Sequence, residues 1–188
     1  KKVHIYGKPS FASFELSARC NLNCPQCDVG NKLTNRKNNF LNYDEYSKII
    51  NEIGPTMLDA IFYFQGEPLL NKNFANYISY AKQYNIYTIT STNAQIINKN
   101  IALDIVKSGL DRIIISIDGT TQEIYEKYRK GGLLSKSIEA IKLLKDSGYT
   151  MALTTNYGNA KVGDDNYLIP RIYIYNEYSL NTFKRLVN

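Results

Sequence analysis

Three cysteines lie close together in the segment Cys20-Asn21-Leu22-Asn23-Cys24-Pro25-Gln26-Cys27, and the chain of 188 residues has no others. Thiolates are the usual protein ligands of iron–sulfur clusters, and a cubic [4Fe–4S] cluster has four iron corners. Three cysteines on one short loop can hold three corners and leave the fourth iron open to a small molecule. The spacing, C-x3-C-x2-C, therefore predicts a [4Fe–4S] cluster bound by Cys20, Cys24 and Cys27.

Cysteines can also bind zinc or form disulfides. A structural zinc site usually has four ligands, and the additional candidates here are Asp28 and the single histidine, His4. A disulfide framework favours an even number of cysteines in a secreted chain, whereas this chain has three and shows no secretory signal. A zinc-binding module remains an alternative to the cluster.

The elements that must position these cysteines follow a strand–loop–helix pattern. Apolar runs predict strands at residues 11–17, 58–64, 86–91, 112–117 and 149–155. Helical spacing, Asn caps and Gly or Pro stops predict helices at residues 43–53, 73–84, 98–107, 121–128 and 137–146. Further along, residues 156–169 are predicted as a loop, 171–175 as a strand and 180–187 as a helix.

This alternation predicts an α/β fold with parallel strands, because parallel neighbours need crossover connections. A complete eight-stranded barrel takes about 250 residues. The chain has room for about six βα units, so we expect a partial (β/α) barrel. We expect residues 1–155 to form the core domain, and residues 156–188 to be a short C-terminal extension that completes or replaces the last units.

Polar segments lie at the carboxyl ends of the first four predicted strands. The cysteine loop follows the first, and the others are Gln65-Gly66-Glu67-Pro68, Ser91-Thr92-Asn93 and Ser116-Ile117-Asp118-Gly119. The carboxyl ends of parallel strands meet at one rim, which is where βα proteins bind their ligands. We therefore expect all four segments to converge on one site.

The cysteine spacing and these segments resemble the radical S-adenosylmethionine (radical SAM) superfamily, over residues 11 to about 147. The resemblance implies that SAM chelates the open iron through its amino and carboxylate groups. One electron from the cluster then cleaves SAM to methionine and a 5′-deoxyadenosyl radical, which takes a hydrogen atom from a substrate. A peptide and a small metabolite are both open as substrates.

The resemblance also assigns roles to single residues. The family usually has Gly-Gly-Glu-Pro after the second strand to hold the SAM amino group; here Gln65, Gly66, Glu67 and Pro68 match it, with Gln65 replacing the first Gly. Asn93 matches a residue near the adenosine. Three further matches resemble the subgroup that often carries a SPASM domain: Ser116 and Asp118 near the ribose, and Arg129 at the SAM carboxylate.

One departure leaves alternatives open. SPASM-associated members have further cysteines for auxiliary clusters, whereas no cysteine follows Cys27 here. Either the protein uses one cluster, or a C-terminal part lies beyond this chain, or it belongs to another subgroup. A small single-cluster enzyme resembling 7-carboxy-7-deazaguanine synthase is one alternative. A non-catalytic module that binds an iron–sulfur cluster or zinc is another.

Composition bounds the partners. The net charge is +6 and the basic residues are scattered, without the aromatic-interleaved basic stripe that is typical of nucleic-acid binding. An acidic electron donor such as flavodoxin or ferredoxin would suit this charge. No apolar run reaches the length of a membrane span, so we expect neither membrane nor nucleic acid as a partner. The expected location is the cytoplasm, where a reducing environment suits an oxygen-sensitive cluster.

Overall fold

The computed structural model describes residues 7–37, 39–172 and 179–187. It divides into two compact units, Lys1–Ser147 and Gly148–Asn188. His4, one of the two additional zinc candidates, lies outside the described residues. The expected domain boundary after residue 155 stays a prediction.

The first unit contains a four-stranded parallel sheet in the order β1-β2-β3-β4. The strands are β1 (Phe11–Ser13), β2 (Asp59–Ile61), β3 (Tyr87–Thr92) and β4 (Arg112–Ile115). The apolar runs predict all four strands, and the expectation of parallel strands joined by helices is confirmed. Three of them end before their apolar runs do, because the chain leaves the ladder there to form the rim loops.

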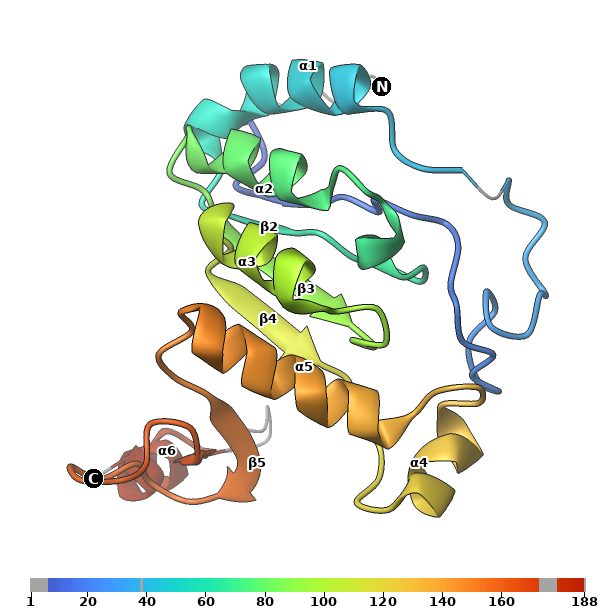
Figure 1. The fold of residues 1–188 in the computed structure, drawn as a ribbon. Coiled ribbons are helices and arrows are strands. Elements are labelled where there is room, and N and C mark those ends of the chain that lie inside the picture. Colours follow the sequence, from blue (N-terminus) through green and yellow to red (C-terminus); the bar gives the residue numbers. More distant parts are fainter. Residues whose placement is uncertain (1–6, 38, 173–178, 188) are drawn as a thin grey trace. The chain divides into compact units, whose positions relative to one another are not determined.

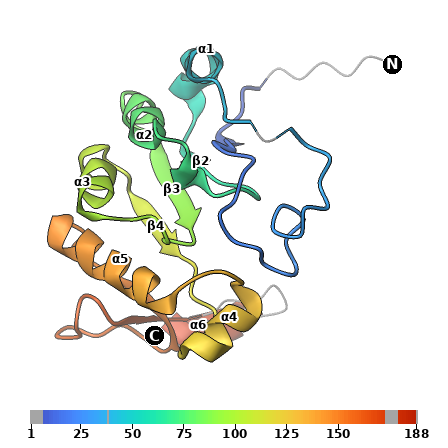
Figure 2. The same ribbon diagram turned by 45° about the vertical axis from the view of Figure 1, so that its right-hand side comes forward.

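Helices cover one face of this sheet (Figures 1 and 2). They are α1 (Tyr43–Ile53), α2 (Phe74–Lys82), α3 (Lys99–Lys107) and α5 (Leu134–Ser147), and they contact one another in that order. Each buries an apolar stripe, as the sequence spacing predicts. In Figure 1 the arrows of β3 and β4 point towards the side where the cysteine loop lies.

Local capping explains where two helices begin. The side chain of Asn42 accepts two backbone N–H groups in the first turn of α1, and Asn98 accepts one in α3. Helix α5 begins at Leu134, three residues before the predicted start. The Leu134 N–H is bound by Gln122 Oε1 at 2.8 Å, a tertiary contact that the local sequence pattern does not show.

Aromatic rings join the first two βα units. The rings of Phe14 and Tyr46 lie 5.0 Å apart edge to face, and those of Tyr46 and Tyr77 lie 4.9 Å apart. The buried Tyr46 hydroxyl donates to the Tyr77 carbonyl at 2.7 Å, so the polar end of this ring is satisfied. This cluster fixes the end of β1 against α1 and α2. It thereby also fixes the start of the cysteine loop, which follows β1.

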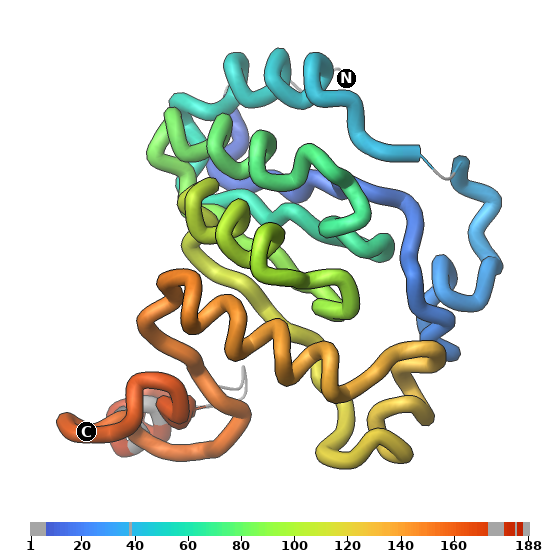
Figure 3. The backbone as a smooth tube through the Cα atoms, in the orientation of Figure 1, coloured from blue at the N-terminus to red at the C-terminus, as the bar shows by residue number. Residues whose placement is uncertain are grey.

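The cysteine loop is a long excursion between β1 and α1, and Figure 3 shows its path along one side of the unit. Backbone hydrogen bonds join its two ends: the Ala18 N–H donates to the Asn39 carbonyl at 3.0 Å, and Ser17 and Phe40 form an antiparallel bridge. At its far end the Asn23 N–H donates to the Lys130 carbonyl at 3.0 Å. That carbonyl follows α4 (Gln122–Tyr128), so helix α4 lies beside the loop.

Short 3-10 helices complete the first unit: η1 (Gly54–Thr56) follows α1, and η2 (Pro68–Leu70) follows β2. Among the described residues, no helix combines the length and the apolar character that crossing a membrane requires.

The second unit contains β5 (Leu153–Tyr157), β6 (Ile169–Arg171) and α6 (Leu180–Val187). The two strands pair in parallel as a separate sheet. The predicted strand at 149–155 starts later and extends to Tyr157, within the stretch predicted as loop. Most side chains of β5 are exposed, so this strand lacks the apolar face that a helix-covered sheet needs. The predicted strand at 171–175 lies largely outside the described residues, whereas the predicted helix at 180–187 is confirmed.

Candidate functional site

A cavity of about 300 Å³ opens at the carboxyl ends of the four parallel strands. The cysteine loop and the three other rim segments all reach it. Of the residues predicted for the site, those that line the cavity are Cys20, Cys24, Cys27, Gln65, Gly66, Glu67, Asn93, Ser116 and Arg129. Pro68 and Asp118 do not line it: Pro68 is buried at the start of η2, and Asp118 pairs with Arg129.

The three cysteines are free thiols, with Cys24 buried and the other two half-buried. The Leu22 N–H lies 3.5 Å from Cys20 Sγ and the Asn93 amide 3.8 Å, so two donors face this sulfur. Cys27 Sγ donates to the Gln65 carbonyl at 3.8 Å. Burial raises the pKa of the Cys20 and Cys24 thiols, and the nearby Arg129 guanidinium partly offsets this for Cys24. Donors aimed at sulfur suit thiolate ligands.

Within residues 7–37, 39–172 and 179–187, no three His, Cys, Asp or Glu side chains converge closely enough to hold one metal ion. A cubic cluster binds each cysteine at a different iron atom, so its ligands need not converge on a point.

Glu67 ties two rim segments together. The residue is only 3% exposed, and its carboxylate accepts hydrogen bonds from the Thr92 hydroxyl at 2.6 Å, the Asn93 N–H at 2.9 Å and the Leu69 N–H at 3.2 Å. Burial raises the pKa of Glu67, and these hydrogen bonds offset part of that effect. The carboxylate therefore holds the end of β3 against η2, a role that the sequence did not predict.

Asn93 connects this part of the rim to the cysteine loop. Its side-chain amide donates to Asn21 Oδ1 at 2.8 Å. The next residue, Ala94, is fully buried with φ of 60°, a left-handed conformation that non-glycine residues seldom adopt. Gln95 then donates to Ser137 Oγ at 2.9 Å, which anchors this turn to α5. The sequence did not predict these roles of Asn21 and Gln95. Asn21 follows Cys20 directly and Gln95 is two positions after Asn93, and this closeness in the sequence is the feature that points to them.

Arg129 lies at the end of α4 and points towards the cysteines. Its Nε pairs with Asp118 Oδ2, and its Nη1 lies 3.9 Å from Cys24 Sγ. The predicted residues Ser116 and Asp118 therefore have different surroundings. Ser116 lines the cavity and its Oγ lies 3.4 Å from Ser91 Oγ, whereas Asp118 orients the Arg129 guanidinium.

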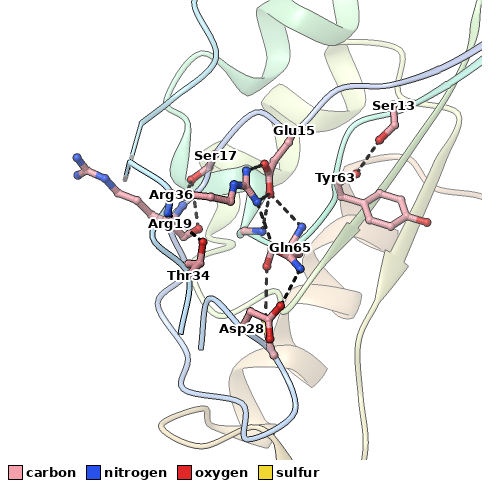
Figure 4. Close-up of polar contacts among 11 residues, drawn as sticks. Ser13, Glu15, Ser17, Arg19, Asp28, Thr34, Arg36, Tyr63 and Gln65 are labelled. Atoms are coloured by element: carbon pink, nitrogen blue, oxygen red, sulfur yellow. Dashed lines mark hydrogen bonds and ion pairs between the residues drawn. The ribbon is translucent and has the colours of Figure 1, made fainter. Parts of the chain in front are cut away.

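Gly66 is needed for a close approach of two backbones. A Cβ at this position would lie 1.8 Å from the Ser17 carbonyl oxygen, and the next N–H, from Glu67, donates to the Arg19 carbonyl at 2.7 Å. The rim therefore packs directly against the residues that lead into the cysteine loop. Gln65 departs from the family glycine, and its side chain is directed to Arg36 and Asp28 (Figure 4).

A sequence profile described as "Radical SAM superfamily" matches residues 14–159, which is most of the chain. This chain belongs to the radical SAM superfamily.

The curated relatives agree with this membership, and a solved structure shares the fold. The chain is 30% identical to PqqA peptide cyclase of Granulibacter bethesdensis over 146 residues, covering 76% of this chain and 38% of that protein. It is 31% identical to GTP 3′,8-cyclase of Thermodesulfovibrio yellowstonii, covering 69% and 41% respectively. Streptococcus suis SuiB bound to S-adenosylmethionine has a similar fold, with a TM-score of 0.61 and 17% identity, covering 95% of this chain and 46% of that one. The chain spans less than half the length of these proteins.

Radical SAM proteins use a [4Fe–4S] cluster and SAM, and the residues present fit both. All three cysteines line one cavity, and N–H donors from Leu22 and Asn93 lie near the sulfur of Cys20. Beside them the same cavity offers amide, hydroxyl and guanidinium groups of the kinds that bind an amino acid and a nucleoside.

Proposed function

We propose that this chain is the catalytic core of a radical SAM enzyme that cleaves SAM reductively and abstracts a hydrogen atom from an organic substrate. Cys20, Cys24 and Cys27 would hold the cluster. SAM would be bound at the predicted rim residues that line the cavity: Gln65, Gly66, Glu67, Asn93, Ser116 and Arg129. Pro68 and Asp118 lie outside this lining, and Asp118 would act by orienting Arg129. The observation that carries the proposal is that segments following four parallel strands, three cysteines among them, share one cavity.

When bound, the cluster supplies the single electron that breaks SAM into methionine and a 5′-deoxyadenosyl radical. The chain contributes binding and orientation. Asp118 occupies the Nε side of Arg129, which leaves N–H groups of the guanidinium for a carboxylate in the cavity. The Asn93 amide and the Leu22 N–H would stabilise negative charge on Cys20 Sγ when this thiolate holds the cluster.

Two classes of substrate are proposed, a peptide and a small metabolite. The relatives include enzymes named for a peptide and for GTP, so a peptide or a small metabolite is the expected substrate. A screen with peptides, nucleotides and the substrate of 7-carboxy-7-deazaguanine synthase separates these substrate classes.

An acidic flavodoxin or ferredoxin is the expected electron donor, in keeping with the net charge of +6. The cytoplasm is the expected location.

Anaerobic reconstitution with iron and sulfide tests the function. After reduction with dithionite in the presence of SAM, we expect about four irons per chain and formation of 5′-deoxyadenosine. Bound zinc without a cluster would contradict the proposal. Four irons without cleavage of SAM would favour a non-catalytic iron–sulfur module.

Cys24→Ala tests the ligand assignment. Losing one of three thiolates should abolish assembly of the [4Fe–4S] cluster, measured as iron per chain and as the visible absorption of the cluster. Asn35→Ala, an exposed position on the same loop, is the matched control and should assemble the full cluster. Full iron content in Cys24→Ala would remove this residue from the ligand set.

A further inference from the structure

Glu15 lies just after β1, and its carboxylate binds two separate parts of the rim. Its Oε1 accepts the backbone N–H groups of Gln65 at 3.1 Å and Gly66 at 3.3 Å. The same carboxylate pairs with both terminal nitrogens of Arg36, which belongs to the chain that follows the cysteines (Figure 4). Glu15 thus contacts the rim on one side and the cysteine loop on the other.

Gln65 closes this arrangement through its side chain. Arg36 Nη1 donates to Gln65 Oε1 at 3.2 Å, while Gln65 Nε2 lies 3.5 Å from Asp28 Oδ2, directly after Cys27. A glycine at position 65, which the family usually has, could make neither contact. The departure at Gln65 is therefore matched by partners in the cysteine loop.

We propose that Glu15, Arg36 and Gln65 form a clamp that sets the distance between the cysteine loop and the SAM-binding rim. This inference rests on the proposed function, because the rim matters here as the site of SAM. Glu15 and Arg36 are positioning residues: they do not line the cavity, and they act through Gln65, which does line it, and through the backbone of residues 65 and 66.

The relative exposure of the partners indicates which bonds matter. The Arg36 side chain is 41% exposed, so its ion pair taken alone stabilises the fold little. Glu15 is only 17% exposed and also accepts two backbone N–H groups, which are charge-assisted hydrogen bonds. Arg36 matters because it fixes the carboxylate in the position where both backbone groups reach it.

The first test uses the full chain without a cluster, so its result does not depend on the proposed function. Amide hydrogen exchange is compared in the wild type, Arg36→Gln and Lys37→Gln, which removes an exposed positive charge from the same loop. In Arg36→Gln we expect the backbone N–H groups of Gln65 and Gly66 to exchange about tenfold faster than in the wild type. Lys37→Gln should exchange like the wild type. Exchange at Ile78, buried in α2, should stay unchanged in all three. Wild-type exchange at residues 65 and 66 in Arg36→Gln would overturn the clamp.

The second test measures SAM affinity in the reconstituted chain, through the change that SAM causes in the EPR spectrum of the reduced cluster. Arg36→Gln and Gln65→Gly should each weaken SAM binding about tenfold. Because both changes remove the hydrogen bond between Arg36 and Gln65, their effects overlap, and the double variant should lose less than the hundredfold that two independent effects would give. A hundredfold loss, or wild-type affinity in Arg36→Gln, would overturn the clamp, and Lys37→Gln should match the wild type. A wild type that binds neither cluster nor SAM would refute the proposed function and leave the exchange result standing.

Discussion

At the scale of single residues, the site depends on side chains that bind other parts of the protein. Glu67 was predicted as a partner of the SAM amino group, yet its carboxylate already accepts three hydrogen bonds from Leu69, Thr92 and Asn93. Burying a carboxylate is unfavourable unless such donors are present. The contact of Glu67 with SAM stays a prediction. We expect Glu67 to contribute to SAM binding also by holding Asn93 in place.

Glu67→Ala is expected to weaken SAM binding about tenfold and to destabilise the fold by about 2–4 kcal/mol, because three donors lose their acceptor. The iron content should not change, since all three cysteines remain. EPR titration with SAM, iron analysis and urea unfolding measure these effects. Glu139→Ala, exposed on α5, is the control and should change stability by less than about 0.5 kcal/mol. Unchanged SAM affinity in Glu67→Ala would exclude Glu67 from the site.

At the scale of the elements, the two ends of the sheet differ in chemistry. The carboxyl ends carry the cavity, whereas the amino ends carry a structural ion pair between Lys82 of α2 and Asp111, at 2.7 Å. Asp111 also accepts the N–H and hydroxyl of Thr88 in β3, at 2.7 and 2.8 Å. In βα proteins the amino ends of the strands generally serve stability rather than catalysis.

Asp111→Asn should therefore lower stability without affecting cluster or SAM binding. Partial burial raises the pKa of Asp111, but the hydrogen bonds from Lys82 and Thr88 outweigh it and hold the pKa below its usual range. A lowered pKa stabilises the fold above the unfolded-state pKa, near about 4, and this contribution is lost as the pH falls through the folded-state value.

Urea unfolding at several pH values measures this. We expect Asp111→Asn to be about 1–2 kcal/mol less stable than the wild type at pH 7, with the difference shrinking below about pH 4. Asp104→Asn, exposed on α3, should match the wild type at every pH. A difference that is the same at pH 3 and pH 7 would show that the charge of Asp111 does not contribute.

At the scale of the whole molecule, the proposed site belongs to the first compact unit. Every predicted ligand, from Cys20 to Arg129, lies within Lys1–Ser147, as do Glu15 and Arg36. The second unit contributes none of these side chains.

Removal of residues 148–188 should therefore leave cluster assembly and SAM affinity intact, within about twofold. Iron analysis and EPR titration of the shortened chain, compared with the full chain, give the result. Circular dichroism establishes in parallel that the shortened chain is folded. A folded chain that has lost its iron would mean that the second unit is required for the site.

The sequence by itself determined the features that depend on local pattern. Apolar runs and helical spacing placed the four parallel strands and the helices between them, and Asn42 and Asn98 marked two helix starts, because caps and periodicity act within a few residues. The cysteine spacing and the polar segments after each strand indicated one rim, and the structure places most of these residues around one cavity.

Only the tertiary structure decided how the rim is held together. Asn93 meets Asn21 across 72 positions, and Arg36 meets Gln65 across 29. The ends of the strands and the pairing of β5 with β6 were likewise set by neighbours distant in the chain. Such contacts have no periodic signature: each depends on which backbone lies opposite once the sheet has formed, so a polar side chain in a loop does not reveal its partner.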